Sequence, residues 1–295
     1  MDETLIILNP AAKGEKALRF LKKIENLPGA TRIELTKQVG DAEKLARVAV
    51  ESGIRKIVAA GGDGTVNGVV NGIGQSGATL GVLPVGTMNV LAAELGLPRD
   101  VEGCWEVICK GNIRHIDLPC ANERYFVQLA GVGLDAQVVR ETDLNFRKHF
   151  GPLSYLVSMA QIAARKPPEL VVNTPDGNIR AGSFVLVGNG RYYGGPFRVF
   201  RDAVMDDGLL EVLVFRDLGY LDIARYIQSM IFGGLPDLDG VDYFQTPSLH
   251  VSSEQIVPVQ LDGEVDFDVP VSFSLAPRKL VVCVPAVATK PLQST

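Results

Sequence analysis

The stretch Ile57-Val-Ala-Ala60, followed at once by Gly61-Gly-Asp-Gly-Thr65, decides the fold of this chain. A short apolar run of this kind predicts a buried β-strand, and the glycines after it predict a turn. Apolar residues at helical spacing then predict a helix that buries Val66, Val69, Val70 and Ile73. A strand, a glycine loop and a helix in this order are typical of a parallel α/β sheet, where ligands bind at the carboxyl ends of the strands.

Two further loops of this kind flank the first one. Asn9-Pro-Ala-Ala-Lys-Gly14 follows the apolar run Thr4–Leu8, and Pro84-Val-Gly-Thr-Met-Asn89 follows Leu80–Leu83. Each loop precedes a predicted helix, whose first N–H groups attract an anion. Glycine lets the backbone approach a phosphate, and hydroxyl groups add donors, whereas one such loop alone is equally compatible with a simple tight turn. The three loops together predict a phosphate site.

The segments around these loops complete an α/β domain. Thr31–Thr36 reads as a further strand, and apolar spacing predicts helices over 17–24 and from Gly40-Asp41 onward. After Ile116 strand-like runs follow one another: Tyr125–Ala130, Ser183–Val187, Leu209–Phe215, Leu249–Ser252, Val257–Leu261, Val269–Leu275 and Leu280–Val284. Only Pro152–Arg165 and Tyr220–Phe232 read as helices among them. We expect a parallel α/β nucleotide-binding domain at 1–118 and a β-sandwich of antiparallel sheets at 119–285. Whether the tail 286–295 joins the first domain is left open.

Composition and charge narrow the class of protein. The 295 residues are 46% hydrophobic and 21% charged, which excludes intrinsic disorder and coiled coil. A net charge of −5 argues against a nucleic-acid partner, since phosphate neutralisation needs a basic surface. The four cysteines form no CxxC pair and the N-terminus lacks a basic leader, so we expect a reduced cytoplasmic protein without a zinc site.

Two patterns in the sequence are misleading. No charged residue occurs from Gly64 to Ala93, but seven glycines and Pro84 in that segment argue against a transmembrane helix. Gly72-Ile-Gly-Gln-Ser-Gly77 matches GxGxxG, yet it follows a helix and precedes a strand, the reverse of a dinucleotide fingerprint. A GxxxxGK[ST] phosphate loop does not occur in the sequence.

The loops continue into a more specific pattern. The motifs are Asn9-Pro10, the GGDGT of 61–65 with Val66-Asn67, PVGTMN with the following AxxLGLP run, Gly131-Val-Gly-Leu-Asp-Ala136, Met205-Asp-Asp-Gly-Leu-Leu-Glu211 and Leu261-Asp-Gly-Glu264. Together they resemble the diacylglycerol kinase catalytic family, which includes sphingosine and ceramide kinases. The resemblance covers nearly the whole chain, with the motifs in family order. It implies an active site between a nucleotide-binding α/β domain and a β-sandwich, a fold shared with NAD kinases.

The resemblance and the loops together define a candidate ATP site. Its residues are Asn9, Pro10, Lys13, Thr36, Gly61, Gly62, Asp63, Gly64, Thr65, Gly86, Thr87 and Asn89. Asp63 lies in an otherwise uncharged phosphate loop, where an unpaired carboxylate would repel the nucleotide and a Mg²⁺ ion would remove the conflict. A helix cap is the competing interpretation of Asp63.

Two carboxylates at the end of a strand-like run are the remaining catalytic candidates. Alternation along the strand would place Asp262 and Glu264 on one face, separated by Gly263. The resemblance implies that Glu264 is the catalytic base, with Asp262 assisting it. Asp63, in the phosphate loop, is the third catalytic candidate. From the residues alone, a polar β-turn is an equally simple interpretation.

The resemblance also implies a structural Mg²⁺ site. At one position, however, the sequence departs from the family's pattern. By position, the Asp207 side chain and the carbonyl groups of Val204 and Leu209 would hold the ion, although Asp-Asp-Gly is also compatible with a hairpin turn. Many bacterial diacylglycerol kinases carry an aspartate directly after the asparagine of the GTxN segment, where this chain has Val90.

The sequence thus predicts an ATP-dependent, Mg²⁺-requiring kinase that phosphorylates a lipid hydroxyl. Pro152–Arg165 is apolar on two faces and is flanked by basic residues, as in a segment that contacts a membrane surface or lipid, although a helix buried between two layers also fits. The alternatives are an NAD kinase and a non-catalytic nucleotide- or lipid-binding protein. The oligomeric state, including a homodimer, is left open.

Overall fold

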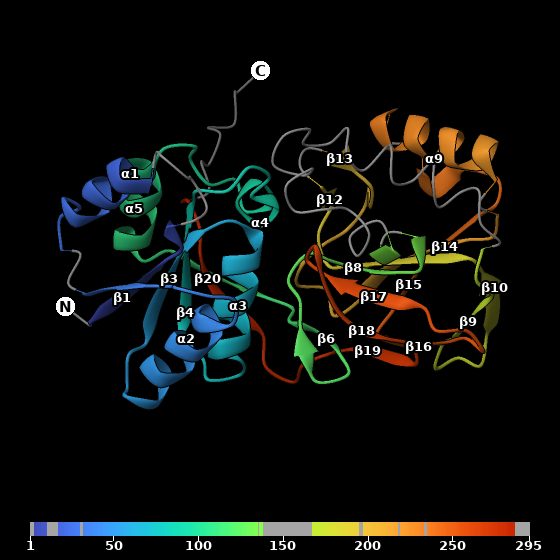
Figure 1. Ribbon diagram of the computed structural model, residues 1–295, viewed down its shortest axis with the longest axis horizontal. Coiled ribbons are helices and arrows are strands. Elements are labelled where there is room, and N and C mark those ends of the chain that lie inside the picture. The colour runs from blue at the N-terminus through green and yellow to red at the C-terminus, as the bar shows by residue number, and fades with distance from the viewer. Residues whose placement is uncertain are drawn as a thin grey trace, which may run out of the picture.

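The computed structural model of the chain describes residues 3–10, 17–29, 32–134, 136–137, 167–194, 197–217, 219–232 and 235–286. Among them lie two bodies side by side, an α/β layer structure and a pair of packed β-sheets (Figure 1). The predicted helix at 152–165, Lys13, and all but the first residue of the tail 286–295 fall outside the described residues.

The first body is built around a six-stranded sheet in the order β2-β1-β3-β4-β20-β5. Its strands are β1 Thr4–Leu8, β2 Arg32–Leu35, β3 Lys56–Gly61, β4 Thr79–Pro84, β5 Ile113–Ile116 and β20 Leu280–Cys283. All neighbours pair in parallel except β20 and β5, which pair antiparallel. The four predicted strands of the parallel sheet are confirmed to within one residue.

Helices cover both faces of this sheet. Their bounds are α1 Ala17–Glu25, α2 Asp41–Glu51, α3 Asp63–Ile73, α4 Val90–Glu94 and α5 Val101–Lys110. Apolar residues of α2 and α3 pack on one face, and those of α1 and α5 on the other. Each parallel strand therefore delivers its carboxyl end to one common edge of the sheet, where the glycine loops lie.

The second body is a sandwich of two antiparallel sheets. One has the order β10-β9-β16-β19-β6-β7 and the other β15-β14-β11-β8-β17-β18. Their strands are β6 Pro119–Ala121, β7 Arg124–Tyr125, β8 Leu129–Val132, β9 Leu170–Asn173, β10 Ile179–Gly182, β11 Phe184–Gly188, β14 Leu210–Phe215, β15 Val241–Thr246, β16 Ser248–Ser252, β17 Pro258–Leu261, β18 Glu264–Asp268 and β19 Val271–Leu275.

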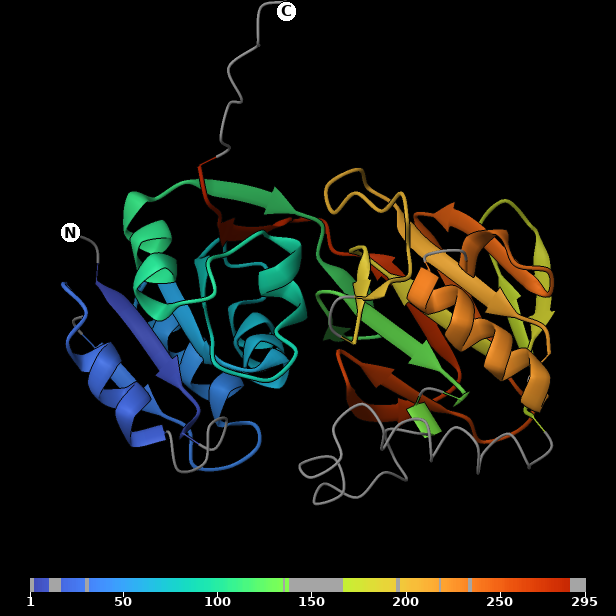
Figure 2. The ribbon, with the colours of Figure 1, turned by 90° about the horizontal axis from the view of Figure 1, so that it is seen from above.

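The sandwich core lies between these sheets, and a helix covers its outer side. Valines from both sheets surround Phe126 and Phe273, whose ring centroids are 6.1 Å apart in an edge-to-face pair. Helix α9 (Tyr220–Phe232), predicted with these bounds, packs on the other face of the β14 sheet, where Tyr226 meets Phe215 (Figure 2). Short elements β12 Tyr192–Tyr193, β13 Phe197–Arg198 and η2 Leu235–Asp237 complete the fold.

One predicted strand belongs to the other body. We expected Leu280–Val284 in the β-sandwich, but β20 lies in the first sheet between β4 and β5. Leu280 and Val282 are 1% and 0% exposed in the α/β core. A short apolar run specifies a buried strand but not its partner, so the assignment of this segment to the second domain is wrong. The chain therefore crosses twice between the two bodies.

A second predicted strand is interrupted. Tyr125–Ala130 divides into β7 and β8, and residues 126–128 between them lie in neither strand. The N–H groups of residues 127–129, which span this break and the start of β8, donate to the carboxylate of Asp262. None of the helices among the described residues is long and apolar enough to cross a membrane. All four cysteines are free in the structure.

Candidate active site

Two of the glycine loops touch each other at the carboxyl edge of the parallel sheet. The N–H groups of Val85 and Gly86 donate to the Gly61 carbonyl at 2.9 and 3.3 Å. A Cβ atom on Gly86 would lie 2.5 Å from the Gly62 Cα atom, a distance that only glycine permits. Asn89 closes the second loop, because its side chain both accepts from the Gly86 N–H and donates to the Gly86 carbonyl. The loops predicted to contact phosphate therefore form one surface.

The third loop joins them through Asn9. The Asn9 Nδ2 atom donates to the hydroxyl of Thr65 at 3.3 Å, which links the end of β1 to the first turn of α3. Thr36 lies beside this point, since its N–H donates to the Leu8 carbonyl at 2.9 Å. Thr87 is exposed at the tip of its loop. The structure thus brings together the predicted nucleotide-binding residues that it describes.

Asp63 begins α3, yet it caps the neighbouring helix α4. Its Oδ1 atom accepts the N–H of Val90 at 2.7 Å. Burial raises the pKa of the Asp63 carboxyl above its ordinary value, the Val90 hydrogen bond opposes this rise, and the negative charge of Asp262 adds to it. Asp63 is therefore a helix cap, as the competing interpretation states, but it caps α4 and not α3.

Glu264 reaches across from the sandwich to the first turn of α3. A Cβ atom on Gly64 would lie 2.5 Å from its Oε1 atom, so glycine at position 64 makes room for the carboxylate. The residue is exposed, but nearby protein atoms partly desolvate its carboxyl group and raise its pKa above the ordinary value. Asp266 and Asp262 add to that rise, whereas Arg124 opposes it. A carboxylate with a raised pKa lies beside the predicted phosphate loop, as a general base requires.

Asp262 does not share a strand face with Glu264. It forms the two-residue turn between β17 and β18 with Gly263, and their φ angles of 47° and 90° are those of a left-handed hairpin turn. The β-turn interpretation is right for the backbone. The alternation that we expected fails because the chain reverses direction at this point.

The carboxylate of Asp262 accepts four hydrogen bonds. Its Oδ2 atom accepts from Asn67 Nδ2 at 2.8 Å and from the Val127 N–H at 2.7 Å. Its Oδ1 atom accepts from the N–H groups of Gln128 and Leu129 at 2.9 and 3.1 Å. Burial raises the pKa of Asp262, and these donors oppose the rise. The side chain therefore ties helix α3 and the β7–β8 connection to the turn that carries Glu264.

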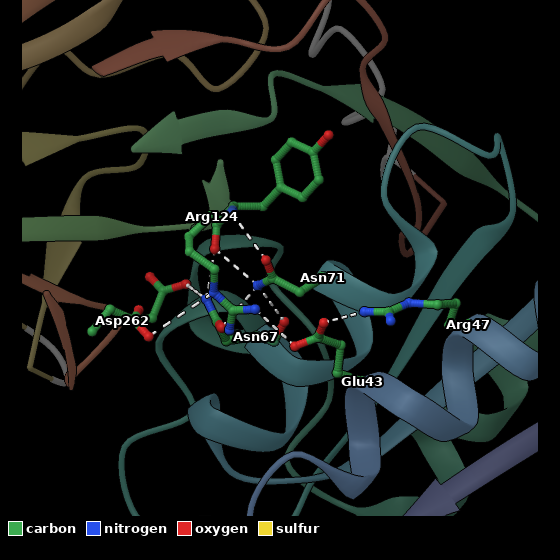
Figure 3. Close-up of polar contacts among 8 residues, drawn as sticks. Glu43, Arg47, Asn67, Asn71, Arg124 and Asp262 are labelled. Atoms are coloured by element: carbon green, nitrogen blue, oxygen red, sulfur yellow. Dashed lines mark hydrogen bonds and ion pairs between the residues drawn. The ribbon is translucent and has the colours of Figure 1, made fainter. Parts of the chain in front are cut away.

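Asparagines on α3 extend this connection between the two bodies (Figure 3). Asn71 donates to the Tyr125 carbonyl at 2.9 Å and accepts the Tyr125 N–H at 3.0 Å, while Asn67 donates to the same carbonyl at 3.1 Å. These hydrogen bonds join the edge strand β7 to helix α3. Sequence reasoning missed Asn71, although two asparagines four residues apart on an otherwise apolar helix were a usable signal.

Arg124 forms a charged bridge above these asparagines. Its Nη1 atom lies 2.8 Å from Glu43 Oε2 on α2 (Figure 3). Its Nε atom lies 3.9 Å from Asp266 Oδ1 on β18. Glu43 also pairs with Arg47. Arg124 was not singled out in the sequence, because nothing near it in the chain reveals partners on two other elements.

A second link between the bodies uses a buried carboxylate. Glu94 on α4 accepts from the Arg191 Nε atom at 2.8 Å and from the Arg191 N–H at 2.7 Å. The Glu94 side chain is only 4% exposed. Gly190 precedes this arginine, and a Cβ atom there would lie 2.9 Å from Glu94 Oε2. The signal that could have found Glu94 is an acid among the apolar residues of a short helix.

The predicted structural Mg²⁺ loop lies apart, beside the edge strand β5, where Arg114 pairs with Asp206. Asp207 is exposed, and its Oδ1 atom accepts the Leu209 N–H at 3.0 Å. The carbonyl of Val204 accepts the Asp207 N–H at 3.4 Å. These three residues form a turn, and they do not meet Asp63 or Glu264.

The glycine contacts predict different outcomes for two neighbouring substitutions. We expect Gly86→Ala to destabilise the protein, because the new Cβ atom meets the Gly62 backbone at 2.5 Å, whereas Gly62→Ala meets only the Gly86 Cα atom at 3.4 Å. Overpacking of this kind costs roughly 1–3 kcal/mol. Thermal unfolding and ATP calorimetry on both variants measure this. Gly62→Ala should melt near the wild type but bind ATP more weakly; equal melting temperatures for the two variants would contradict the packing described.

Comparisons with known proteins agree with this arrangement. The family profile "Diacylglycerol kinase catalytic domain" matches residues 3–121, and "YegS C-terminal NAD kinase beta sandwich-like domain" matches residues 128–284. The chain is 32% identical over 292 residues to a protein of Chromohalobacter salexigens named "Probable lipid kinase YegS-like", covering 96% of this chain and 93% of that protein. It is 31% identical over 276 residues to a diacylglycerol kinase of Staphylococcus epidermidis, covering 91% and 87% of the two chains.

A solved structure shows the same fold. A crystal structure of a diacylglycerol kinase from Bacillus anthracis superposes with a TM-score of 0.79 at 27% sequence identity. The superposition covers 96% of this chain and 97% of that one. The expected α/β domain followed by a β-sandwich is therefore confirmed.

Proposed function

This chain belongs to the diacylglycerol kinase family of lipid kinases, and from that premise we propose that it transfers the γ-phosphoryl group of ATP to a lipid hydroxyl with the help of Mg²⁺. The observation that carries the proposal is the position of Glu264, whose carboxylate lies against Gly64 in the first turn of α3. A general base and a phosphate loop from different bodies meet there. Family membership makes the chain a phosphotransferase with an alcohol acceptor; the nucleotide, the metal and the substrate class are our proposal.

The glycine loops supply the phosphate site. Gly62 and Gly86 present bare backbone to each other, and Thr65 contributes a hydroxyl at the N-terminus of α3. Phosphates bound at this edge would meet the free N–H groups of the helix, which carry about half a positive charge. Asn9, which bonds to Thr65, would hold the third loop in place beside them.

Glu264 would act on the acceptor. The lipid hydroxyl gives its proton to the Glu264 carboxylate while its oxygen forms a bond to the γ-phosphorus, and the bond from that phosphorus to the bridging oxygen of ADP breaks. ADP leaves with the electron pair of that bond. Asp262 would be a positioning residue, because both of its oxygens accept donors from the protein and it lies two residues before Glu264.

The residues beside the phosphate loop fit a nucleotide-bound Mg²⁺ ion. Asp63 is a carboxylate with a hydrogen bond from the Val90 N–H to one oxygen. It directly follows Gly62, whose backbone lies so close to Gly86 that a Cβ atom on Gly86 would meet it at 2.5 Å. When bound, Mg²⁺ would neutralise charge on the β- and γ-phosphates. Val90 supplies no second carboxylate in these loops, so Asp63 would serve this ion as their main acidic side chain.

The acceptor would be a lipid alcohol of the diacylglycerol kind. The relatives named above support that class, and we propose transient contact with the membrane surface, where such a substrate resides.

A homodimer is also compatible with the family and is tested by the molar mass in solution. We retain the domain limits 1–118 and 119–285 as a proposal, with β20 reassigned to the first body.

A screen with [γ-³²P]ATP tests the proposal. The purified chain is incubated with labelled ATP, Mg²⁺ and micelles of diacylglycerol, monoacylglycerol, sphingoid base, ceramide or phosphatidylglycerol, with NAD as a separate acceptor. We expect label in one or more lipids and none in NAD. Label in NAD alone would replace the proposal by NAD kinase activity, and no label in any acceptor would favour a non-catalytic binding protein.

A further inference from the structure

Glu264 and a second acid, Glu43, lie along one face of helix α3, because that face carries glycines. Gly64, Gly68 and Gly72 are four residues apart and therefore line one side of the helix. A Cβ atom on Gly68 would lie 3.5 Å from the Glu43 nitrogen, and one on Gly72 would collide with the Glu43 carbonyl oxygen. Gly64, which Glu264 contacts, comes one helical turn earlier, roughly 6 Å along the axis. The two acids are thus neighbours on this face.

Arg124 joins the elements that carry these acids. Its Nη1 atom donates to Glu43 Oε2 at 2.8 Å, and Figure 3 shows its side chain directed toward Glu43. Its Nε atom lies 3.9 Å from Asp266 Oδ1, two residues after Glu264 on β18. The guanidinium group therefore reaches from α2 to the strand that carries the proposed base.

The backbone that carries Arg124 is fixed without its side chain. The next residue, Tyr125, donates its N–H to Asn71 Oδ1 at 3.0 Å and accepts the Asn71 Nδ2 atom at 2.9 Å. These hydrogen bonds hold β7 on α3. A substitution at position 124 should therefore remove a charge from the site and leave the strand in place.

The charges around Glu264 are mostly negative. They come from its own strand, the preceding turn, α3, α2 and β7: Asp266, Asp262, Asp63, Glu43 with its partner Arg47, and Arg124. Burial and the charges of Asp266 and Asp262 raise the pKa of the Glu264 carboxyl, and Arg124 opposes this rise. Among the residues that the structure describes, Arg124 is the only basic side chain whose charge acts on this carboxyl.

We propose that Arg124 is a positioning residue for the reaction and acts through Glu264: held from α2 by Glu43, its guanidinium group offsets the surrounding acids and keeps Glu264 charged beside Gly64. A carboxylate surrounded by acids alone would retain its own proton and could not accept one from a lipid hydroxyl. The inference rests on the proposed function, in which Glu264 is the base, and adds the group that makes this base usable.

A titration that needs no catalysis tests the electrostatic part. The side-chain carboxyl ¹³C signal of Glu264 is followed with pH in the full chain labelled at glutamate, and Glu264→Gln identifies the signal by its loss. We expect Glu264 to titrate at higher pH in Arg124→Met than in the wild type. Arg124→Lys should titrate near the wild type, because it keeps the charge. An unmoved titration in Arg124→Met would overturn the proposal.

The pH dependence of kcat, with ATP and lipid saturating, tests the catalytic part. We expect Arg124→Met to lose about threefold or more of kcat on the acid limb, which moves to higher pH, and Arg124→Lys to recover most of it. The KM for ATP should change little. An equal loss at every pH, with the limb unmoved, would show a merely structural role. If the wild type labels no acceptor, the kinase proposal fails, and the Glu264 titration alone decides what Arg124 does.

Arg47→Met is the matched control. Arg47 pairs with the same Glu43 but lies on α2, and its charge is not among those that act on Glu264. We expect the wild-type titration and acid limb in this variant. A shift as large as that of Arg124→Met would contradict a role specific to Arg124. Thermal unfolding checks that each variant is folded; if Arg124→Met is not, Arg124→Gln replaces it, with the same expected shift.

Discussion

Glu264→Gln is expected to lower kcat for lipid phosphorylation by roughly 10²–10⁴, the usual effect of removing a general base. This loss corresponds to about 3–5 kcal/mol of activation free energy. Glutamine keeps the size of the side chain that contacts Gly64 but cannot take a proton from an alcohol. Because the carboxylate belongs to the sandwich while the phosphate loops belong to the α/β body, ATP binding should change little. Steady-state kinetics and ATP calorimetry on the same preparation measure both quantities.

Asp266→Asn is the matched control for this substitution. Asp266 lies two residues further along β18 and is also acidic, but its contact is with Arg124 at 3.9 Å and not with the α3 loop. It should keep most of the wild-type kcat. If Glu264→Gln retains more than about a tenth of wild-type kcat, less than the usual loss, Glu264 is not the base and Asp63 is the next candidate.

Asp262→Ala is expected to reduce the free energy of unfolding by roughly 3–5 kcal/mol, because the four donors that its carboxylate accepts lose their acceptor. Three of these donors are the backbone N–H groups of residues 127–129, at the break between β7 and β8. Activity should fall as well, since the turn that positions Glu264 loses its attachment to α3. Urea unfolding followed by circular dichroism measures the loss of stability.

Asp266→Ala is the control for stability. Its ion pair with Arg124 is long and partly exposed, so we expect a loss below about 1 kcal/mol. An Asp262→Ala variant as stable as Asp266→Ala would show that Asp262 does not join the two bodies. In that case, a direct catalytic role for Asp262 would be favoured over the positioning role proposed here.

The predictable part of the fold is local in the sequence. Each strand of the parallel sheet up to β4 is followed directly by its loop and helix, so periodicity and glycine placement identify the unit without knowledge of distant residues. The site residues of these loops meet because parallel strands share one carboxyl edge. Asn9 and Thr65, 56 residues apart, were brought together by that rule.

The parts that the sequence could not predict depend on partners far along the chain. Strand β20 looks like any short apolar run, and only its pairing with β4 and β5 assigns it to the first sheet. The run from Tyr125 to Ala130 is apolar enough for one strand, but it is broken at residues 126–128. Asp262, more than 130 positions away, accepts the N–H groups of residues 127–129. The ion pair of Lys279, directly before β20, with Asp117, directly after β5, is likewise set by the β20–β5 register and by no nearby residue.

The pH dependence of kcat for the wild type and Glu264→Gln, with ATP and lipid saturating, tests the central claim most directly. A general base acts only when deprotonated, so activity is lost as the pH falls through its pKa. Partial burial and the charges of Asp266 and Asp262 raise the pKa of Glu264. The wild type should therefore show an acid limb whose midpoint lies above the ordinary pKa of a glutamate. Glu264→Gln should show a low rate without that limb; an unchanged limb in the variant would assign the titration to another group, such as Asp63, and contradict the account.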